Sequence, residues 1–124
     1  MAEPNAITVV EVDSSGEVRR STPTWADLKA IGPGVSVAQL VEPSDGGPIW
    51  AVVRYDAGVH VPFHADDQLD QLIVVLRGAV AFLGKDDEIA LKSGDFLRVA
   101  PRVDHGWRVG SDPVELAVFA YVPR

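Results

Sequence analysis

Short apolar runs, each closed by turn-forming residues, follow one another from Val35 almost to the end of the chain. We expect strands at 35–41, 49–55, 60–66, 71–76, 79–83, 88–91, 96–99, 105–109 and 114–122. The 11 glycines and 9 prolines of the chain serve the turns. No segment after residue 34 has helical periodicity long enough for a crossover helix. Evenly spaced short strands of this kind predict an all-β fold, a sandwich or barrel of antiparallel strands.

The first 34 residues carry weaker signals. Ile7 to Val12 alternates loosely enough to predict a strand, and Thr24 to Leu28 predicts a single helical turn capped by Thr24. Gly32-Pro33-Gly34 then breaks the chain. Because 124 residues suffice for one core, we expect a single domain, 1–124, with an N-terminal arm at 1–34 and a barrel at 35–122.

Composition narrows the class of function. The chain has no cysteine, so disulfides, thiolate metal sites and a cysteine nucleophile are excluded. A net charge of −7 makes nucleic acid and anionic membrane surfaces poor partners. The N-terminus lacks the basic start and apolar core of a secretion signal, and no apolar run is long enough for a membrane span. We therefore expect a cytoplasmic protein that acts on a small molecule.

The run from Leu72 to Leu76 is apolar on both faces of its expected strand. Both faces must then be covered. The interior of a small barrel covers only one of them, which leaves the N-terminal segment or a second subunit for the other. We expect a homodimer.

Candidate chemistry gathers around two of the three histidines. His64 and Asp66 stand two residues apart on an expected strand, so their side chains leave the same face. Gln71 has the wrong parity for that face, but the turn-like 67–70 segment can reset it. His105 comes from a later strand. Two imidazoles and a carboxylate form the facial triad of non-haem iron, and they also suit manganese, nickel or zinc.

The spacing of these residues resembles the first motif of the cupins, which reads Gly, five residues, His-x-His, three or four residues, Glu, six residues, Gly. This chain has Gly58, five residues, His64-x-Asp66, four residues, Gln71, six residues and Gly78. The resemblance implies a double-stranded β-helix, the jelly-roll barrel of short antiparallel strands, with little helix.

The second cupin motif is Gly, five residues, Pro-x-Gly, two residues, His, three residues, Asn. Here it reads Gly94, five residues, Ala100-x-Arg102, two residues, His105, three residues and Val109. Other short matches, at Trp25, 33–35, Arg54 and 94–98, resemble the cupin domains of zinc-dependent anti-sigma factors and small diketone-cleaving dioxygenases.

The departures from the motif concern the metal. The family usually holds its metal with three histidines and a glutamate, whereas this chain has Asp66 for the second histidine and Gln71 for the glutamate. The net ligand charge stays the same, which favours a retained site made of His64, Asp66, Gln71 and His105. Aspartate is shorter than histidine and an amide binds more weakly, which favours a metal-free protein.

Two further observations refine the site. The pattern His-x-Asp with a distant His also occurs in 2-oxoglutarate oxygenases, but Glu115 stands where those enzymes usually carry a basic residue. Arg54, Trp107 and Phe63 are candidate residues of the substrate pocket. Three nearby side chains need another explanation: we take Asp67 and Asp70 as a solvated acidic turn, and His60 as a surface residue.

Three functions stay open at this point. The first is a metal-dependent enzyme, with Fe(II) before manganese, nickel or zinc, acting as a dioxygenase or Lewis acid on an enolisable carbonyl substrate. The second is a metal-free isomerase, cyclase or lyase, in which His64 or His105 is the general base, assisted by Asp66 or Gln71. The third is a ligand-binding or anti-sigma-like sensor without enzymatic activity. We place the metal-dependent enzyme first.

Overall fold

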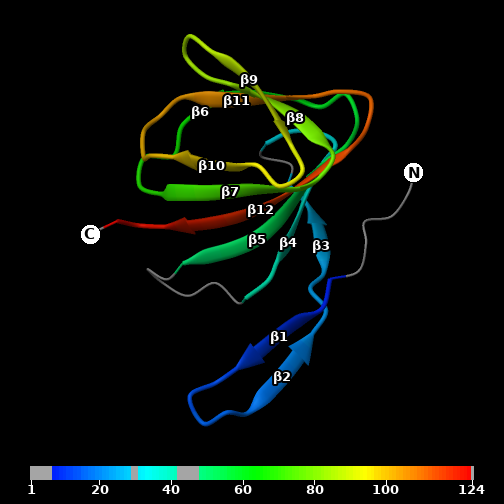
Figure 1. Ribbon diagram of the computed structural model, residues 1–124, viewed down its shortest axis with the longest axis vertical. Helices are drawn as coiled ribbons and strands as arrows, with labels where there is room; N and C mark the ends of the chain where they lie inside the picture. The colour runs from blue at the N-terminus through cyan, green and yellow to red at the C-terminus, as the bar shows by residue number, and fades with distance from the viewer. Residues whose placement is uncertain (1–6, 29–30, 42–47, 124) are drawn as a thin grey trace.

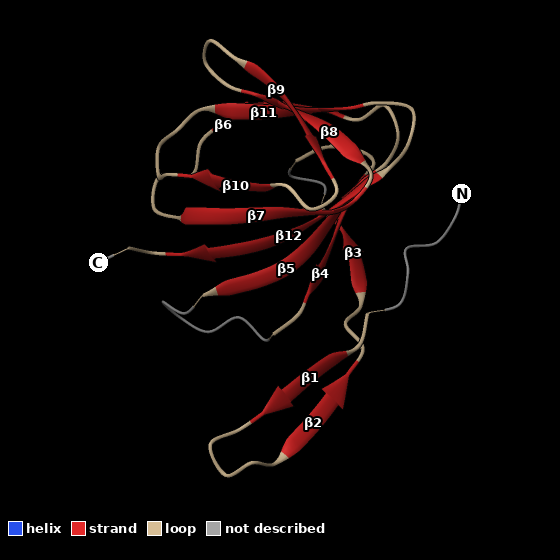
Figure 2. Cartoon of the chain, viewed as in Figure 1, coloured by secondary structure: helices blue, strands red, loops and turns tan. Residues whose placement is uncertain are grey.

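The computed structural model describes residues 7–28, 31–41 and 48–123 (Figure 1). Its regular structure is entirely β-strand (Figure 2). The strands are β1 (Val9–Val12), β2 (Val18–Ser21), β3 (Trp25–Asp27), β4 (Val35–Gln39), β5 (Ile49–Tyr55), β6 (His60–His64), β7 (Asp70–Arg77), β8 (Ala79–Leu83), β9 (Glu88–Lys92), β10 (Phe96–Val99), β11 (His105–Val109) and β12 (Val114–Tyr121). The all-β prediction is confirmed. No helix in the described part of the chain is long and apolar enough to cross a membrane.

Two large antiparallel sheets enclose the core. One has six strands in the order β10-β7-β12-β5-β4-β3, and the other has four in the order β6-β11-β8-β9. Strands β1 and β2 pair only with each other, as a hairpin that stands clear of both larger sheets in Figure 1.

Two local predictions for the N-terminal arm need correction. The segment 24–28 forms no helical turn: Trp25 pairs with Ala38 as β3 joins the free edge of β4, and the Leu28 N–H donates to the carbonyl of Val35. An unpaired strand edge satisfies more backbone groups than one isolated turn does, so the pairing overrides the capping signal of Thr24. Strand β2 (Val18–Ser21) was not expected, because its sequence VRRS lacks apolar alternation.

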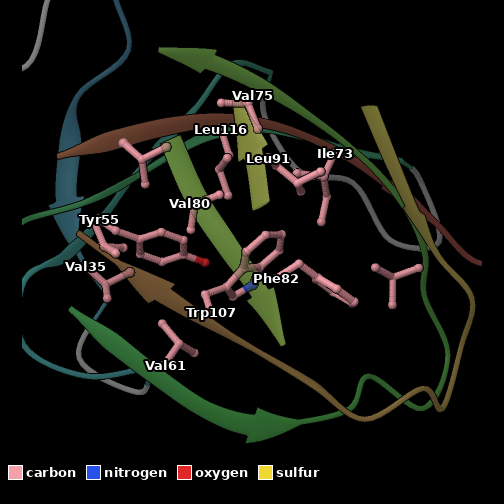
Figure 3. Close-up of a cluster of buried hydrophobic side chains, with 13 residues drawn as sticks. Val35, Tyr55, Val61, Ile73, Val75, Val80, Phe82, Leu91, Trp107 and Leu116 are labelled. Carbon is pink, nitrogen blue, oxygen red and sulfur yellow. The ribbon is translucent and has the colours of Figure 1, made fainter. Parts of the chain in front are cut away.

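The core lies between the facing sides of the two sheets (Figure 3). Alternate residues of β7, Ile73 and Val75, point into it from the six-stranded sheet, and Phe82 and Trp107 point into it from the other. Burying each such side chain contributes roughly 1.5–3 kcal/mol. The whole cluster comprises Val35, Tyr55, Val61, Ile73, Val75, Val80, Phe82, Leu91, Val99, Trp107, Val109, Val114 and Leu116.

Asp70 is a buried partner in an ion pair, so its interpretation as part of a solvated turn was wrong. Its side chain is only 5% exposed and accepts two hydrogen bonds from Arg98, from Nε at 3.1 Å and from Nη2 at 2.6 Å. The Arg98 guanidinium lowers the pKa of Asp70 below its usual range. The pair joins the start of β7 to β10, and it gives the buried charge of Asp70 the partner that it requires, since Arg98 itself is 67% exposed.

Two glycines with the same backbone conformation differ in their surroundings. Gly78 has φ +86°, and an added Cβ would meet the Pro113 carbonyl oxygen at 2.5 Å. Gly94 has φ +94° with nothing within 4 Å of the same position. Gly94→Ala should therefore cost about 1 kcal/mol, from backbone strain alone. Gly78→Ala should cost about 1–3 kcal/mol more, because a backbone carbonyl cannot rotate away.

Urea unfolding of both alanine variants beside the unaltered chain measures this difference. Equal losses of unfolding free energy would show that the turn at Gly78 relaxes freely and that the close approach to Pro113 is not a constraint.

Candidate functional site

Pairing of β6 with β11 brings His64 opposite His105. The two residues are direct partners in the antiparallel register. Their ring centroids lie 4.5 Å apart, with the ring planes tilted by 51°. Forty-one residues apart in sequence, these two imidazoles form the centre of the candidate site.

A β-bulge in β6 aims both Val61 and His64 inward. Trp107 pairs with Val61 and His105 with His64, so that Pro62 and Phe63 together oppose a single residue of β11, Gly106. Without the extra residue, the period-two alternation of a strand would turn His64 and Val61 to opposite faces. The bulge fits because Gly106 has no side chain: a Cβ there would lie 2.7 Å from the Val61 carbonyl oxygen.

The backbone fixes the proton position on both rings in the same way. His64 Nδ1 lies 3.0 Å from the Pro62 carbonyl oxygen, and His105 Nδ1 lies 3.0 Å from the Val103 carbonyl oxygen. A carbonyl oxygen only accepts hydrogen bonds, so each Nδ1 carries a proton and donates it. On each neutral ring this leaves Nε2 with a free lone pair, able to act as a base or as a ligand.

His105 is almost fully buried, with 1% of its surface exposed, whereas His64 is half-buried. Phe82 stacks on His105 at 5.7 Å between centroids, and Trp107 meets its ring edge-on at 6.1 Å (Figure 3 shows both aromatic rings). Burial lowers the pKa of His105 from 6.5, and the charge of His64 lowers it further, against the hydrogen bond to Val103. The ring is therefore neutral near pH 7.

Asp66 stabilises the turn after β6, a role that the sequence analysis did not predict. Strand β6 ends at His64 rather than at residue 66, and Asp66 begins the turn that follows. Its Oδ1 accepts hydrogen bonds from the backbone N–H groups of Gln68 and Leu69, at 3.0 and 2.9 Å. Its carbonyl oxygen accepts a third, from the N–H of Arg102 at 2.7 Å. One carboxylate oxygen is thus committed to shaping the loop.

The remaining candidate site residues lie on different strands and faces of the barrel. Gln71 lies on the core side of β7, in the same alternation as Ile73. Trp107 shares the inward face of β11 with His105, because the two residues stand two apart on the strand. Phe63 sits on the bulge and is 52% exposed. Arg54 alternates with core residues of β5, so it points to the other side of the sheet, where Nε lies 3.6 Å from Asp56.

The sequence analysis did not predict some features of this site. Phe82 stacks on His105, although nothing in the sequence distinguishes it from other apolar residues of the core. The carbonyl partners of the two imidazoles belong to the backbone and leave no trace in residue type. Near the other end of β6 lies a cavity of about 410 Å³, lined by Ile31, Gly32, Pro33, Val35, Ala57, Gly58, Val59, His60 and Pro62. Its walls include the third histidine, His60, and neither His64 nor His105.

The described residues do not fit a facial triad. Within the described part of the chain, no three His, Cys, Asp or Glu side chains lie close enough together to bind one metal ion. Two imidazoles present free Nε2 atoms, but the carboxylate expected to join them, Asp66, is engaged in its turn. The donor set that the structure brings together is therefore a histidine pair.

Comparison with known proteins identifies the family. A family model described as "Cupin domain" matches residues 51–121, more than half of the chain. The chain belongs to the cupin family. The motif resemblance and the jelly-roll architecture expected from it are confirmed, and cupins commonly bind divalent metals. No curated protein matches the sequence of this cupin.

Solved cupin structures share its fold at low sequence identity. KdgF from Halomonas sp. is 20% identical, with a TM-score of 0.66 over 81% of this chain and 89% of that one. A predicted oxalate decarboxylase from Thermotoga maritima is 16% identical, with a TM-score of 0.69 over 82% and 92%. The polyketide cyclase RemF from Streptomyces resistomycificus is 18% identical, with a TM-score of 0.64 over 74% and 68%. At these identities the likeness establishes the fold alone.

Gly106→Ala should disturb the site directly. The new Cβ would press on the Val61 carbonyl, and the bulge would have to shift, which we expect to cost about 1–3 kcal/mol of unfolding free energy. Gly110→Ala is the matched control, because Gly110 follows the same strand with nothing within 4 Å of its Cβ position. Urea unfolding, with NMR signals of His64 and His105 as reporters, tests this. Equal losses of unfolding free energy and equal changes in the histidine NMR signals of the two variants would contradict the packing argument.

The buried ring should make stability depend on pH. Because the folded-state pKa of His105 is lowered, its neutral form stabilises the fold fully above about pH 6.5, and this contribution is lost as the pH falls below that value. Between about pH 7 and 5, urea unfolding should therefore show a smaller loss of unfolding free energy for His105→Gln than for the unaltered chain. The prediction would be contradicted if the unfolding free energy of His105→Gln fell with pH as steeply as that of the unaltered chain. An NMR titration that places the pKa of His105 above 6.5 would also contradict it.

Proposed function

We propose that this cupin is a small-molecule enzyme, an isomerase, cyclase or lyase, that moves a proton on an enolisable carbonyl substrate by means of His64 and His105. The observation that carries the proposal is the pairing of two imidazoles whose Nδ1 protons are both held by backbone carbonyls. Such a pair presents two Nε2 atoms, and imidazole is the side chain suited to proton transfer near neutral pH.

The two rings differ in a way that divides the roles. His105 is buried against Phe82 and is neutral near pH 7, so its Nε2 is the base that removes the proton α to the substrate carbonyl. His64 is more exposed than His105. When it carries the proton, it donates from Nε2 to the enolate oxygen or to a second carbon. His105 gains one proton and His64 loses one, and the cycle closes when a proton passes from His105 back to His64, the ring centroids being 4.5 Å apart. No other reactant is then needed for an isomerisation.

The surroundings support a substrate with an apolar body. Phe82 and Trp107 flank His105 on the interior side, and Gln71 faces the interior from the opposite sheet. An amide at that place has both a donor and an acceptor for a substrate oxygen. The solved structure of a polyketide cyclase on this fold supports the proposal to the extent that a cupin barrel accommodates a cyclase.

The metal-dependent alternative ranks second for this chain. The family commonly binds divalent metals, but the described donors amount to a histidine pair rather than three clustered ligands. A Fe(II), manganese, nickel or zinc requirement is therefore a separate outcome of the test below. The mechanism proposed here passes through no metal.

Deuterium exchange tests the proposal even though the natural substrate is unidentified. The protein is incubated in D₂O, with a chelator, beside a set of hydroxy-ketones and 1,3-diketones, and loss of the α-proton signal is followed by NMR. We expect catalysed exchange with at least one of these compounds. His105→Gln and His64→Gln should each slow it roughly 10²–10⁴-fold.

His60→Gln is the matched control, because it removes the third imidazole, which lies at the other end of β6 from His64, and should leave exchange unchanged. Exchange abolished by the chelator and restored by Fe(II), manganese, nickel or zinc would favour the metal-dependent alternative. Exchange that is insensitive to both histidine variants would contradict the assigned roles.

A further inference from the structure

Tyr55 and Trp107 carry polar atoms into the core. Tyr55 lies on β5 of the six-stranded sheet and is 7% exposed, and Trp107 lies on β11 of the other sheet and is 2% exposed. Their ring centroids are 6.4 Å apart, with the ring planes tilted by 38°. In Figure 3 the Tyr55 oxygen and the Trp107 nitrogen are both directed toward the middle of the cluster. The phenol and the indole therefore present their polar atoms to the same part of the barrel interior.

These two polar atoms have no partner in the part of the chain that the structure describes. Neither the Tyr55 hydroxyl nor the Trp107 indole N–H forms a hydrogen bond with any residue there. Every side-chain polar atom in the same ranges that is sealed off from water does have a partner, so both atoms border on space that a water molecule can reach. A buried phenol or indole usually has a hydrogen-bond partner, because leaving the bond unmade is costly. The two atoms are thus available to a partner from outside the chain.

Trp107 links Tyr55 to the histidine pair. Its ring meets that of His105 edge-on at 6.1 Å, and Phe82 contacts both, at 5.3 Å from Trp107 and 5.7 Å from His105 between centroids. Trp107 is therefore a common neighbour of Tyr55 and His105. A molecule held at both places has to pass the apolar faces of Trp107 and Phe82.

We propose that the Tyr55 hydroxyl and the Trp107 N–H bind a second oxygen of the substrate, which an apolar body separates from the carbon that His105 deprotonates. The inference rests on the proposed function for the reacting end of the substrate and deepens it by naming the substrate class. That class is an enolisable ketone with a neutral oxygen at the far end of a ring-sized apolar body. Tyr55 and Trp107 act as specificity residues and take no part in proton transfer.

The chemistry of the two groups defines the oxygen that they accept. An indole N–H only donates, so the substrate atom must be an acceptor, whereas a phenol can donate or accept. Burial raises the pKa of Tyr55, so its hydroxyl keeps its proton and can donate it. Hydroxyl and carbonyl oxygens meet these conditions. A carboxylate would need a cation, but the buried guanidinium of Arg54 points to the other side of the sheet.

Binding of two matched ketones tests the inference without any turnover. Acetophenone or para-hydroxyacetophenone, which differ by one hydroxyl opposite the acetyl group, is added to isotope-labelled protein, and the assigned indole N–H signal of Trp107 is followed by NMR. We expect para-hydroxyacetophenone to shift this signal and to bind roughly fivefold more tightly than acetophenone. Tyr55→Phe, which keeps the ring, should lose most of this preference.

The comparison variant is Tyr121→Phe, which removes the other of the two tyrosine hydroxyls of the chain. Tyr121 is 48% exposed and its hydroxyl lies 3.4 Å from Asp70 Oδ2, so the preference should stay unchanged. Urea unfolding adds a second measurement. Because the Tyr55 hydroxyl bonds to no described residue, Tyr55→Phe should keep the unfolding free energy of the unaltered chain or raise it.

Three results would overturn the inference. They are binding of neither ketone, a preference that Tyr55→Phe leaves intact, and binding that leaves the Trp107 signal in place. A Tyr55→Phe variant that is clearly less stable would also overturn it, since the hydroxyl would then serve the fold.

Deuterium exchange at the acetyl group distinguishes this failure from a failure of the proposed function. Where exchange is catalysed, Tyr55→Phe should raise KM for para-hydroxyacetophenone about fivefold and leave kcat nearly unchanged, because the lost contact is the same in the ground and transition states. Exchange that needs both His64 and His105 but ignores the hydroxyl would overturn the inference alone. A preference that depends on Tyr55, without catalysed exchange, would support the oxygen site and contradict the proposed function.

Discussion

A polar ring can be buried in an apolar interior only where its N–H groups find acceptors, and this requirement organises the histidine end of the barrel. The acceptors are the carbonyls of Pro62 and Val103, each two residues before the histidine it serves. The Pro62 carbonyl lies within β6 and the Val103 carbonyl just before β11, and these two strands pair in the same sheet. The proton positions of the two rings are therefore set by the same backbone that aligns the strands, and site and sheet form together.

The segments next to the histidines are tied to each other as well. Asp66 closes the turn after β6 with its carboxylate, and its carbonyl receives the N–H of Arg102 from the segment before β11. Arg102 has φ 66°, a left-handed conformation that costs a non-glycine residue about 1–2 kcal/mol. The cupin motif has glycine there. The strain and the committed carboxylate both indicate that this loop pair is kept for its shape, with a ligand position of the motif turned to a structural use.

Strand positions were predictable because burial in two sheets imposes an alternation that the sequence must obey. The bounds 49–55, 79–83, 96–99 and 105–109 agree with β5, β8, β10 and β11. The β1–β2 hairpin was only half predicted, because Val18–Ser21 pairs by register and turn rather than by an apolar pattern of its own.

The site was less predictable, since its geometry depends on an interruption of the alternation. Counting residues at i and i+2 put His64 and Asp66 on one face of a continuous strand. The structure ends that strand at His64, after a bulge that only the absence of a side chain at Gly106 permits. The close approach of Gly106 to the Val61 carbonyl depends on the pairing of two strands about forty residues apart. It therefore cannot be predicted from the sequence of either strand alone.

The two faces of the six-stranded sheet are subject to different physical constraints. Ile73 and Val75 complete a closed core, in which any change of volume is transmitted to the rings of Phe82 and His105. Leu72 and its neighbours on the outer side touch none of these groups, since alternate residues of a strand leave by opposite faces. The outer surface can therefore change without moving the imidazoles. The apolar character of both faces of β7, already visible in its sequence, serves the core that holds the pair of histidines on one side, whereas on the other side Leu72 is 40% exposed among the described residues.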